Sequence, residues 1–265
     1  MHIAVCIKQV PSTNEVRLDP VTKTIIRDGK QSVINPFDTY AIEEAVRIRE
    51  RIGGKVTALS MGIPATERLI RDALARGVDE GMLLTDRAFA GADTLATSYT
   101  LSLGIQEMGD VSLIICGRMA VDGDTAQIGP ELAETLGIPH ATDVVEIEDI
   151  TEERIRVRRM TENGYQILEV KLPALITVVK DINMPRLPSI SGIRYSMEGH
   201  FRKLTAANVP ADRARLGLDG SPTQVVKTET PERRMVSASL DGSAAEQATQ
   251  ILTLWKEAAH GRIED

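Results

Sequence analysis

The stretch that decides the fold is IICGRMAVDGDTAQIGP, residues 114–130. It begins as an apolar run typical of a strand, passes through an Asp-Gly-Asp turn and leads into the helix-forming residues 131–136. In parallel α/β proteins a helix N-terminus at the carboxyl edge of the sheet offers free N–H groups and a positive dipole end, which attract phosphate. An ordinary connecting loop fits this spacing equally well.

The start of this helix depends on three residues. Asp124 fits the N-cap, and Gln127, three residues later, fits a capping box. Pro130 is favoured in a helix's first turn and would kink a helix that began at Thr125, so the start stays open by one turn. Asp122 and Asp124 also allow a paired-carboxylate or metal site, although turn and cap roles are commoner for Asp in such a loop.

The composition is that of a globular protein, with 265 residues of which 42% are hydrophobic and 26% charged. Aromatic residues make up 3% and the formal net charge is −7, so we expect no nucleic-acid partner. No leader and no apolar run long enough to span a bilayer is present, and the two cysteines lie far apart. We therefore expect a cytoplasmic protein without a transmembrane segment. The histidines are isolated, and no metal site is predicted.

Apolar runs of strand type alternate with helical stretches through the first half of the chain. The alternation predicts a doubly wound, mostly parallel sheet, and the short turns after Gly137 predict an antiparallel meander added to it. The expected strands are 2–8, 55–61, 81–85, 111–116, 143–150, 154–159, 165–172 and 173–180, the expected helices are 38–52, 64–76 and 93–107, and a small hairpin is expected at 16–27.

The remainder of the chain has weak periodicity. Residues 184–232 are rich in Pro, Gly, Ser and Thr and have loop character, and 243–259 form an amphipathic helix with the single Trp, Trp255. That helix either docks on another subunit or packs on its own core. We expect a nucleotide-binding α/β domain over residues 1–183 and a loop, an extended segment and a helical arm over 184–265.

Polar residues follow the predicted strands and could surround an adenine nucleotide. The chain has no dinucleotide fingerprint, no phosphate loop and no nucleophile elbow. A bound cofactor would therefore carry any chemistry, and we assign no catalytic residue. The segments concerned are Cys6 to Gln9, Asn35 to Asp38, Met61 with Gly62, Asp93 with Thr94 and Thr97, and Gly117 to Gln127.

In these same segments the chain resembles the β subunit of electron-transfer flavoproteins. The matching segments are VCIKQVP (5–11), INPFDTYAIEEAVRIRE (34–50), ALSMG (58–62), LLTDRAFAGADTLATS (83–98), GRMAVDGDTAQIGPELAETLG (117–137) and PALITVVK (173–180). The resemblance implies an adenine-nucleotide-hydrolase-like α/β fold, an α-subunit partner and a bound nucleotide. In housekeeping members that nucleotide is AMP with a structural role, whereas members that are similar in the DGDTAQ-x-GP loop bind a second FAD.

Members with that loop are associated with electron bifurcation. The resemblance implies that NADH delivers a hydride to the β-subunit flavin. One electron then passes through the α-subunit FAD to a dehydrogenase of acyl-CoA, lactate or quinone-linked type, and the other passes to ferredoxin or flavodoxin. Two alternatives stay open: a non-bifurcating β subunit that binds AMP, and a nucleotide-binding regulator without redox work.

The resemblance also assigns residues by position. The expected cofactor contacts are Cys6, Ile7, Lys8, Asn35, Phe37, Met61, Asp93, Thr94, Thr97, Arg118, Asp122, Gly123, Asp124, Thr125, Ala126 and Gln127. Leu187 matches the anchoring Leu of the family's recognition loop for partner dehydrogenases, and the helix with Trp255 matches in character the arm that wraps the α subunit. The basic run that follows the recognition loop in housekeeping members is replaced here by Gly192-Ile193-Arg194-Tyr195, which leaves the partner dehydrogenase open.

Overall fold

The computed structural model describes residues 1–12, 32–227 and 239–260. Contacts divide the chain into two units, Met1–Val226 and Lys227–Asp265. In the second unit the structure describes one helix, α6 (Ala244–His260). The hairpin predicted over 16–27 lies outside the described residues.

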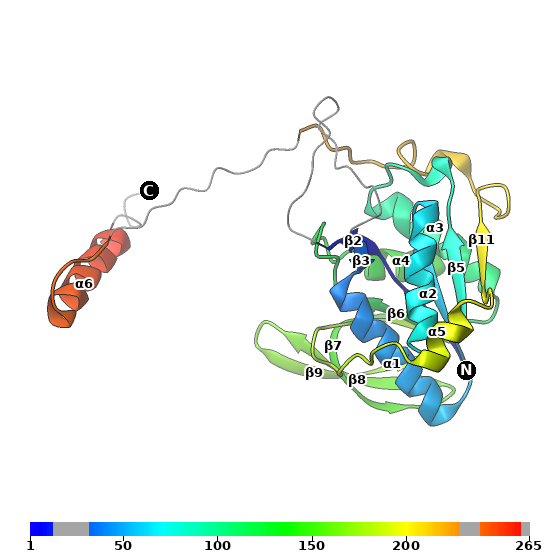
Figure 1. Ribbon diagram of the computed structural model, residues 1–265, viewed down its shortest axis with the longest axis horizontal. Helices are drawn as coiled ribbons and strands as arrows, with labels where there is room; N and C mark the ends of the chain where they lie inside the picture. The colour runs from blue at the N-terminus through cyan, green and yellow to red at the C-terminus, as the bar shows by residue number, and fades with distance from the viewer. Residues whose placement is uncertain (13–31, 228–238, 261–265) are drawn as a thin grey trace. The chain divides into compact units, whose positions relative to one another are not determined.

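The first unit is built on a nine-stranded sheet with the order β11-β5-β4-β1-β6-β10-β7-β8-β9 (Figure 1). The parallel strands are β1 (His2–Cys6), β4 (Lys55–Met61), β5 (Glu80–Leu84), β6 (Leu113–Gly117), β10 (Ala174–Val178) and β11 (Phe201–Leu204). Strand β7 (His140–Ile150) pairs parallel with β10 and antiparallel with β8 (Arg154–Thr161), which pairs antiparallel with β9 (Gly164–Lys171). The predicted parallel sheet with an added meander is confirmed. A separate ladder joins β2 (Gln9–Pro11) and β3 (Ser32–Ile34).

Helices cover both faces of the sheet. Helices α1 (Pro36–Ile52) and α2 (Glu67–Ala75) lie on one face, with α5 (Ile190–Ser196) packed against α2 (Figure 1). Helices α3 (Thr94–Met108) and α4 (Ile128–Leu136) pack on the other face. The described residues also form three short 3₁₀ helices, at Pro64–Thr66, Arg87–Phe89 and Arg213–Arg215.

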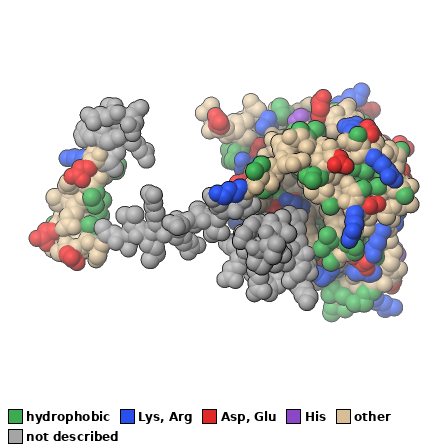
Figure 2. Space-filling view, turned by 90° about the horizontal axis from the view of Figure 1, so that it is seen from above, with side chains coloured by type: hydrophobic (Ala, Val, Ile, Leu, Met, Phe, Trp, Pro, Cys, Tyr) green, Lys and Arg blue, Asp and Glu red, His purple; other side chains and the backbone are tan. Residues whose placement is uncertain are grey.

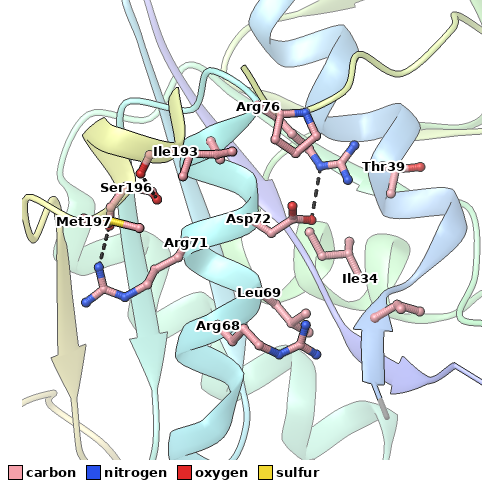
Figure 3. Close-up of a pocket in the computed structure, with 13 residues that line it drawn as sticks. Ile34, Thr39, Arg68, Leu69, Arg71, Asp72, Arg76, Ile193, Ser196 and Met197 are labelled. Carbon is pink, nitrogen blue, oxygen red and sulfur yellow. Dashed lines mark hydrogen bonds and ion pairs between the residues drawn. The ribbon is translucent and has the colours of Figure 1, made fainter. Parts of the chain in front are cut away.

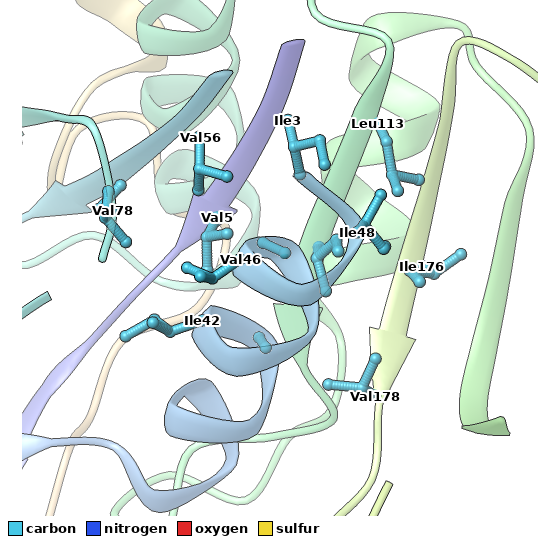
Figure 4. Close-up of a cluster of buried hydrophobic side chains, with 14 of the residues drawn as sticks. Ile3, Val5, Ile42, Val46, Ile48, Val56, Val78, Leu113, Ile176 and Val178 are labelled. Atoms are coloured by element: carbon cyan, nitrogen blue, oxygen red, sulfur yellow. The ribbon is translucent and has the colours of Figure 1, made fainter. Parts of the chain in front are cut away.

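Two hydrophobic clusters, one on each face, form the core. On the α1 face Ile42 and Val46 pack against Val5 and Val56 of the central strands (Figure 4). Because β1, β4 and β6 are buried on both faces, their sequences are near-continuous apolar runs. On the surface, acidic and basic side chains are interspersed over the face that Figure 2 shows.

Two elements lie where the sequence predicts a loop. Helix α5 begins after Ser189, whose Oγ accepts a hydrogen bond from the Gly192 N–H at 2.9 Å, and β11 adds a parallel edge strand beside β5. Both elements are too short to show a periodicity, which is why the sequence pattern misses them. None of the described helices is both long enough and apolar enough to cross a membrane.

Candidate functional site

The candidate site lies at the carboxyl edge of the sheet, between β1 and β6. From β1 the chain builds β4 and β5 on one side, and then places β6 on the other side of β1. The two strands are parallel, with Cys6 opposite Cys116. Loops diverge at such a switch point and leave a crevice, which is where ligands of open α/β sheets bind.

The first strand ends in two buried side chains and one exposed cation. Cys6 is 7% exposed and packs on the α3 face, and Ile7 is 5% exposed and packs on the α1 face. Both of these predicted site residues therefore turn their side chains into the core. Lys8 reaches outward, and its Nζ lies 2.6 Å from Asp122 Oδ1. Met61, at the end of β4, is half-buried.

Asn35 joins the start of α1 to the 117–127 loop. Its side chain is buried, and its Nδ2 donates to Met119 O at 2.8 Å, while its Oδ1 accepts from the Val121 N–H at 3.1 Å. The half-buried Phe37 packs against Gly117, where an added Cβ would lie 2.7 Å from Phe37 Cβ. Only glycine therefore fits at the end of β6.

The loop itself has an unusual backbone. Asp124 and Ala126 adopt left-handed conformations, with φ of 51° and 54°. A left-handed alanine costs about 1–2 kcal/mol, so surrounding contacts have to hold it. The loop is held by the Lys8–Asp122 ion pair and by a hydrogen bond from Asp124 N to Ala120 O at 2.8 Å. Such strain is found at ligand-binding segments more often than elsewhere.

The helix after this loop begins at Ile128, so of the two starts that the sequence leaves open the later one is found, and Asp124 is not the cap. Gln127 occupies the N-cap position and makes no side-chain cap hydrogen bond, so the predicted capping box does not form either. Because Asp124 and Ala126 are left-handed, the loop continues to Gln127 before the helix begins. Pro130 then falls in the first turn of the helix, where proline is tolerated. The first N–H groups of α4 lack a side-chain cap, an arrangement that suits a phosphate.

Helices α3 and α4 meet beside the loop through Thr94 and Glu131. Thr94 Oγ1 lies 3.1 Å from Glu131 Oε1 and 3.4 Å from Gln127 Oε1. Burial raises the pKa of Glu131, and the hydrogen bond from Thr94 opposes that rise. Glu131 Oε2 is buried without a hydrogen-bond partner among the described residues. A buried oxygen of this kind is a natural acceptor for a ligand donor.

Two further predicted residues lie on α3. Asp93 caps the helix, since its Oδ1 accepts from the Ala96 N–H at 3.1 Å, and its Oδ2 accepts from Thr223 Oγ1 at 2.9 Å. Its carboxylate is therefore occupied within the chain. Thr97 is half-buried one turn after Thr94, on the same side of the helix.

The remaining predicted residues differ in their surroundings. Arg118 turns toward β7, where its Nε lies 2.7 Å from Asp143 Oδ1. Gly123, Thr125 and Ala126 are exposed on the loop. The structure thus gathers the predicted residues around one edge, with Cys6, Ile7, Asp93 and Arg118 engaged by the protein itself.

Two acidic residues lie at this site besides the predicted contacts: Asp38, which ends the predicted segment Asn35 to Asp38, and Glu131. Asp38 is buried in the first turn of α1, and its Oδ2 accepts from the Lys8 N–H at 2.7 Å. Burial raises the pKa of Asp38 to about 7, against the lowering effect of hydrogen bonds from Asn35 and Lys8. In the sequence each reads as an ordinary acidic residue at a helix start.

A separate cavity of 540 Å³ runs along α2, between β3 and α5 (Figure 3). Its arginines are already engaged, since Arg76 Nε lies 3.1 Å from Asp72 Oδ2 and Arg71 donates to Ser196 O. None of the predicted cofactor contacts lines it. We therefore distinguish this cavity from the candidate nucleotide site.

The predicted partner-binding residues are both exposed. Leu187 is 82% exposed, between Met184 at 88% and Ile190 at 90%. Trp255 is 66% exposed within the second unit. Exposed apolar side chains of this size are expected at protein–protein contacts.

Comparison with known proteins gives consistent matches. Residues 22–209 match the family model described as electron transfer flavoprotein domain. The chain is 51% identical over 254 residues to the electron transfer flavoprotein subunit beta of Thermoanaerobacterium thermosaccharolyticum, which covers 95% of this chain and 96% of the relative. It is 42% identical over 259 residues to the caffeyl-CoA reductase-Etf complex subunit CarD of Acetobacterium woodii, with 97% and 98% covered. Protein FixA of Bradyrhizobium diazoefficiens is 40% identical over 259 residues, with 95% and 90% covered.

Proposed function

Since the chain belongs to the electron transfer flavoprotein family as a β subunit, we propose that it binds FAD at the 117–127 loop and takes electrons from NADH in complex with an α subunit. The observation that carries the proposal is the polar surface that continues from the uncapped start of α4 to Thr94 on α3. We place this complex in the cytoplasm.

The chemistry of the donor set fits a dinucleotide. The N–H groups at the start of α4 suit a diphosphate, and Asp122 suits a ribose hydroxyl. Glu131 Oε2, without a partner among the described residues, would accept a hydrogen bond from a donor on the ligand. FAD carries donors both in its ribityl chain and at its ring edge, and Glu131, Thr94 and Thr97 would hold this part of the cofactor.

The protein's own part is to bind and orient the cofactor. When bound, FAD supplies the acceptance of a hydride and the release of electrons. Lys8, held by Asp122 at 2.6 Å, fixes a positive charge beside the loop, and Asn35 fixes the loop's backbone. These contacts hold the 117–127 loop in one conformation before the ligand binds, which lowers the entropic cost of binding.

We propose that the electrons divide between two acceptors. One goes to ferredoxin or flavodoxin, and the other goes through the FAD of the α subunit to a dehydrogenase of acyl-CoA, lactate or quinone-linked type. The relative named as a subunit of a caffeyl-CoA reductase-Etf complex favours a CoA-ester enzyme. On this chain we assign dehydrogenase docking to the segment around Leu187 and α-subunit docking to the face of α6 with Trp255.

A flavin count tests the proposal. The chain is purified with its α subunit, and FAD and AMP are extracted and quantified per heterodimer. Two FAD, together with bleaching of the flavin spectrum by NADH, is the expected result. One FAD with one AMP, and no reaction with NADH, overturns it in favour of a β subunit whose nucleotide is structural. A stable monomer that binds nucleotide without an α subunit points instead to a regulator.

Two variants test whether Thr94 contacts the second FAD. Thr94→Val keeps the shape of the side chain and removes its hydroxyl, so the second FAD should bind about tenfold more weakly. Thr135→Val on α4 is the matched control, because its hydroxyl bonds within its own helix to Glu131 O at 2.7 Å. Equal losses in the two variants would count against Thr94 as a cofactor contact.

A further inference from the structure

The cavity along α2 has a largely apolar lining, part of which is exposed (Figure 3). Its volume of 540 Å³ lies within the range of about 300–1,000 Å³ that is typical of binding pockets. Leu69 of α2 is buried in its wall, whereas Val33 of β3 and Ile193 and Met197 of α5 line it with exposed side chains. The cavity therefore offers apolar surface to a second molecule.

Helix α5 is fastened to α2, so the cavity between them is preformed. The Ser189 N–H donates to Ala75 O at 3.2 Å, and an added Cβ at Gly192 would lie 2.2 Å from the same oxygen, so only glycine allows this approach. Arg71 of α2 donates to Ser196 O at the other end of α5. Because these contacts already hold α5, a partner would lose little entropy in ordering the cavity.

The charged side chains that line the cavity are mainly basic, three arginines with one acid, although the whole chain has a formal net charge of −7. Arg76 pairs with that acid, Asp72, at 3.1 Å. Arg71 pairs with Glu67 at 2.8 Å, but Glu67 also pairs with Lys203 at 2.7 Å. Cations therefore outnumber acids here, and this face favours an acidic partner.

Arg68 makes no ion pair with the residues that the structure describes. It extends from α2 toward β3 (Figure 3), where its guanidinium donates to the backbone oxygen of Ser32 and, at 3.3 Å, to Ser32 Oγ. Both acceptors are uncharged, so the positive charge of this exposed side chain is left uncompensated. A guanidinium forms strong, often bidentate hydrogen bonds to a carboxylate.

The cavity continues the exposed segment that carries Leu187. Pro188, the next residue, lines the cavity, and so does Ile193 from the stretch 192–195. That stretch has a single basic residue, Arg194, so the cations that line the cavity come from α2. A partner that covers Leu187 therefore also meets the apolar lining and the arginines of the cavity.

We propose that the cavity is a second docking point for the dehydrogenase that contacts Leu187. It receives an apolar side chain of that partner, and a carboxylate beside this side chain pairs with Arg68. The inference rests on the proposed function, because it needs a dehydrogenase at the segment around Leu187. It adds the chemistry of the partner's surface, an apolar residue next to an acid.

Electron transfer between the heterodimer and a dehydrogenase tests this inference. Purified enzymes of acyl-CoA, lactate and quinone-linked type are assayed, and the one with the lowest KM is used. Arg68→Glu should raise that KM about tenfold without changing kcat, and the effect should shrink at high salt. Arg68→Lys keeps the charge and should stay close to the wild type. Arg51→Glu, at an exposed arginine in the last turn of α1, is the matched control and should leave KM unchanged.

Met197→Ala tests the apolar part of the docking point. Because Met197 is 73% exposed, its truncation should leave the free energy of unfolding nearly unchanged. The KM for the same dehydrogenase should nevertheless rise severalfold. Val226→Ala, at an exposed position outside the lining of the cavity, is the control and should change neither quantity.

Carbodiimide cross-linking identifies the partner's residue directly. The amine of Arg68→Lys should couple to a carboxylate of the dehydrogenase, whereas the wild type offers no amine at this position. Mass spectrometry of the coupled peptides should find an apolar residue beside the coupled acid. Absence of a cross-link that depends on Arg68→Lys overturns the pairing of Arg68 with a carboxylate.

The outcomes separate this inference from the proposed function. If Leu187→Ala raises the KM but Arg68→Glu and Met197→Ala do not, the cavity is not a docking point, although the proposed function stands. An effect of Arg51→Glu as large as that of Arg68→Glu also overturns the inference, because it would reflect net charge alone. If none of the dehydrogenases exchanges electrons with the heterodimer, the proposed function fails, and the inference fails with it.

Discussion

Arg186 clamps Glu43, because its Nε and backbone N–H both donate to Glu43 Oε2, at 2.8 and 3.0 Å. Its Nη1 also bonds Glu50 Oε1 at 2.6 Å. The Glu43 side chain is only 7% exposed, whereas that of Glu50 is 49% exposed. The segment after β10 is therefore fastened to α1 immediately before the exposed Leu187.

Because Arg186 pairs with one buried and one exposed acid, we expect Arg186→Ala and Glu50→Gln to lower the free energy of unfolding by different amounts. Arg186→Ala leaves the buried Glu43 unpaired and should lower the free energy of unfolding by about 3 kcal/mol. Glu50→Gln removes the exposed partner and should cost less than about 1 kcal/mol. Urea unfolding of both variants measures the difference, and equal losses would show that the Glu43 contact contributes no more than a surface ion pair.

Leu187→Ala should change docking and not stability. The side chain is 82% exposed, so its removal should shift the free energy of unfolding by less than about 0.5 kcal/mol. The KM for the partner dehydrogenase should rise at least severalfold if Leu187 anchors the complex. Val225→Ala, at another position that is 87% exposed, is the control and should leave KM unchanged.

The free energy of unfolding should depend on pH in a way that is set partly by Asp38. Its pKa rises from 3.8, the ordinary value for an Asp side chain, to about 7 in the folded chain, so the folded state holds the proton more tightly. Stability contributed by this group therefore falls as pH rises from about 4 to about 7 and is level above that. The stability of the wild type relative to Asp38→Asn should be greater at pH 5.5 than at pH 8. An unchanged difference, measured by urea unfolding, contradicts this assignment.

Gly117 should tolerate no side chain. In Gly117→Ala the new Cβ would lie 2.3 Å from Asp38 Oδ1, so nucleotide affinity should fall at least tenfold. At Gly123 an added Cβ meets only Lys8 Nζ, at 3.8 Å, so Gly123→Ala should bind almost normally. Fluorescence titration with FAD compares the two variants, and similar affinities would mean that the close packing at Gly117 is not required.

Trp255→Ala should weaken the association with the α subunit. Trp residues are frequent hot spots, and truncation of one typically costs about 2 kcal/mol or more, which is roughly a thirtyfold loss of affinity. Thr253→Ala, on the same helix, is the control, because the Thr253 hydroxyl bonds back to Thr249 O at 3.0 Å. Sedimentation of the mixed subunits measures both dissociation constants.

The sequence predicts the fold well because parallel strands that are buried on both faces can be recognised in it as mainly apolar runs. The run 114–116 is apolar throughout and lies inside β6, and the strand predicted over 55–61 is found with the same bounds, Lys55–Met61. Helix α5 and strand β11 cannot be recognised in this way, because both are short. Helix α5 depends on packing against α2, and strand β11 depends on pairing with β5.

The sequence predicts that the candidate residues lie at one edge of the sheet, but it does not predict their contacts. Strand ends indicate which edge carries the loops, and the predicted residues do gather there. The sequence pattern leaves the helix start open between Asp124 and the turn that follows, because no pattern of residue types displays the left-handed backbone of Asp124 and Ala126. Asp38 lies in a predicted segment, Asn35 to Asp38, but its role is not displayed by the sequence, since it binds backbone N–H groups of two other segments.

The two cysteines offer a practical consequence of the β1–β6 pairing. Cys6 and Cys116 are the chain's entire complement of thiols, lie opposite each other and are both buried. The contact with Cys6 and burial raise the pKa of the Cys116 thiol, and both sulfurs are buried, so neither should react with alkylating reagents while these strands stay paired. The rate of thiol labelling therefore reports how often the central strands β1 and β6 separate. Mass spectrometry can measure this rate without any engineered probe.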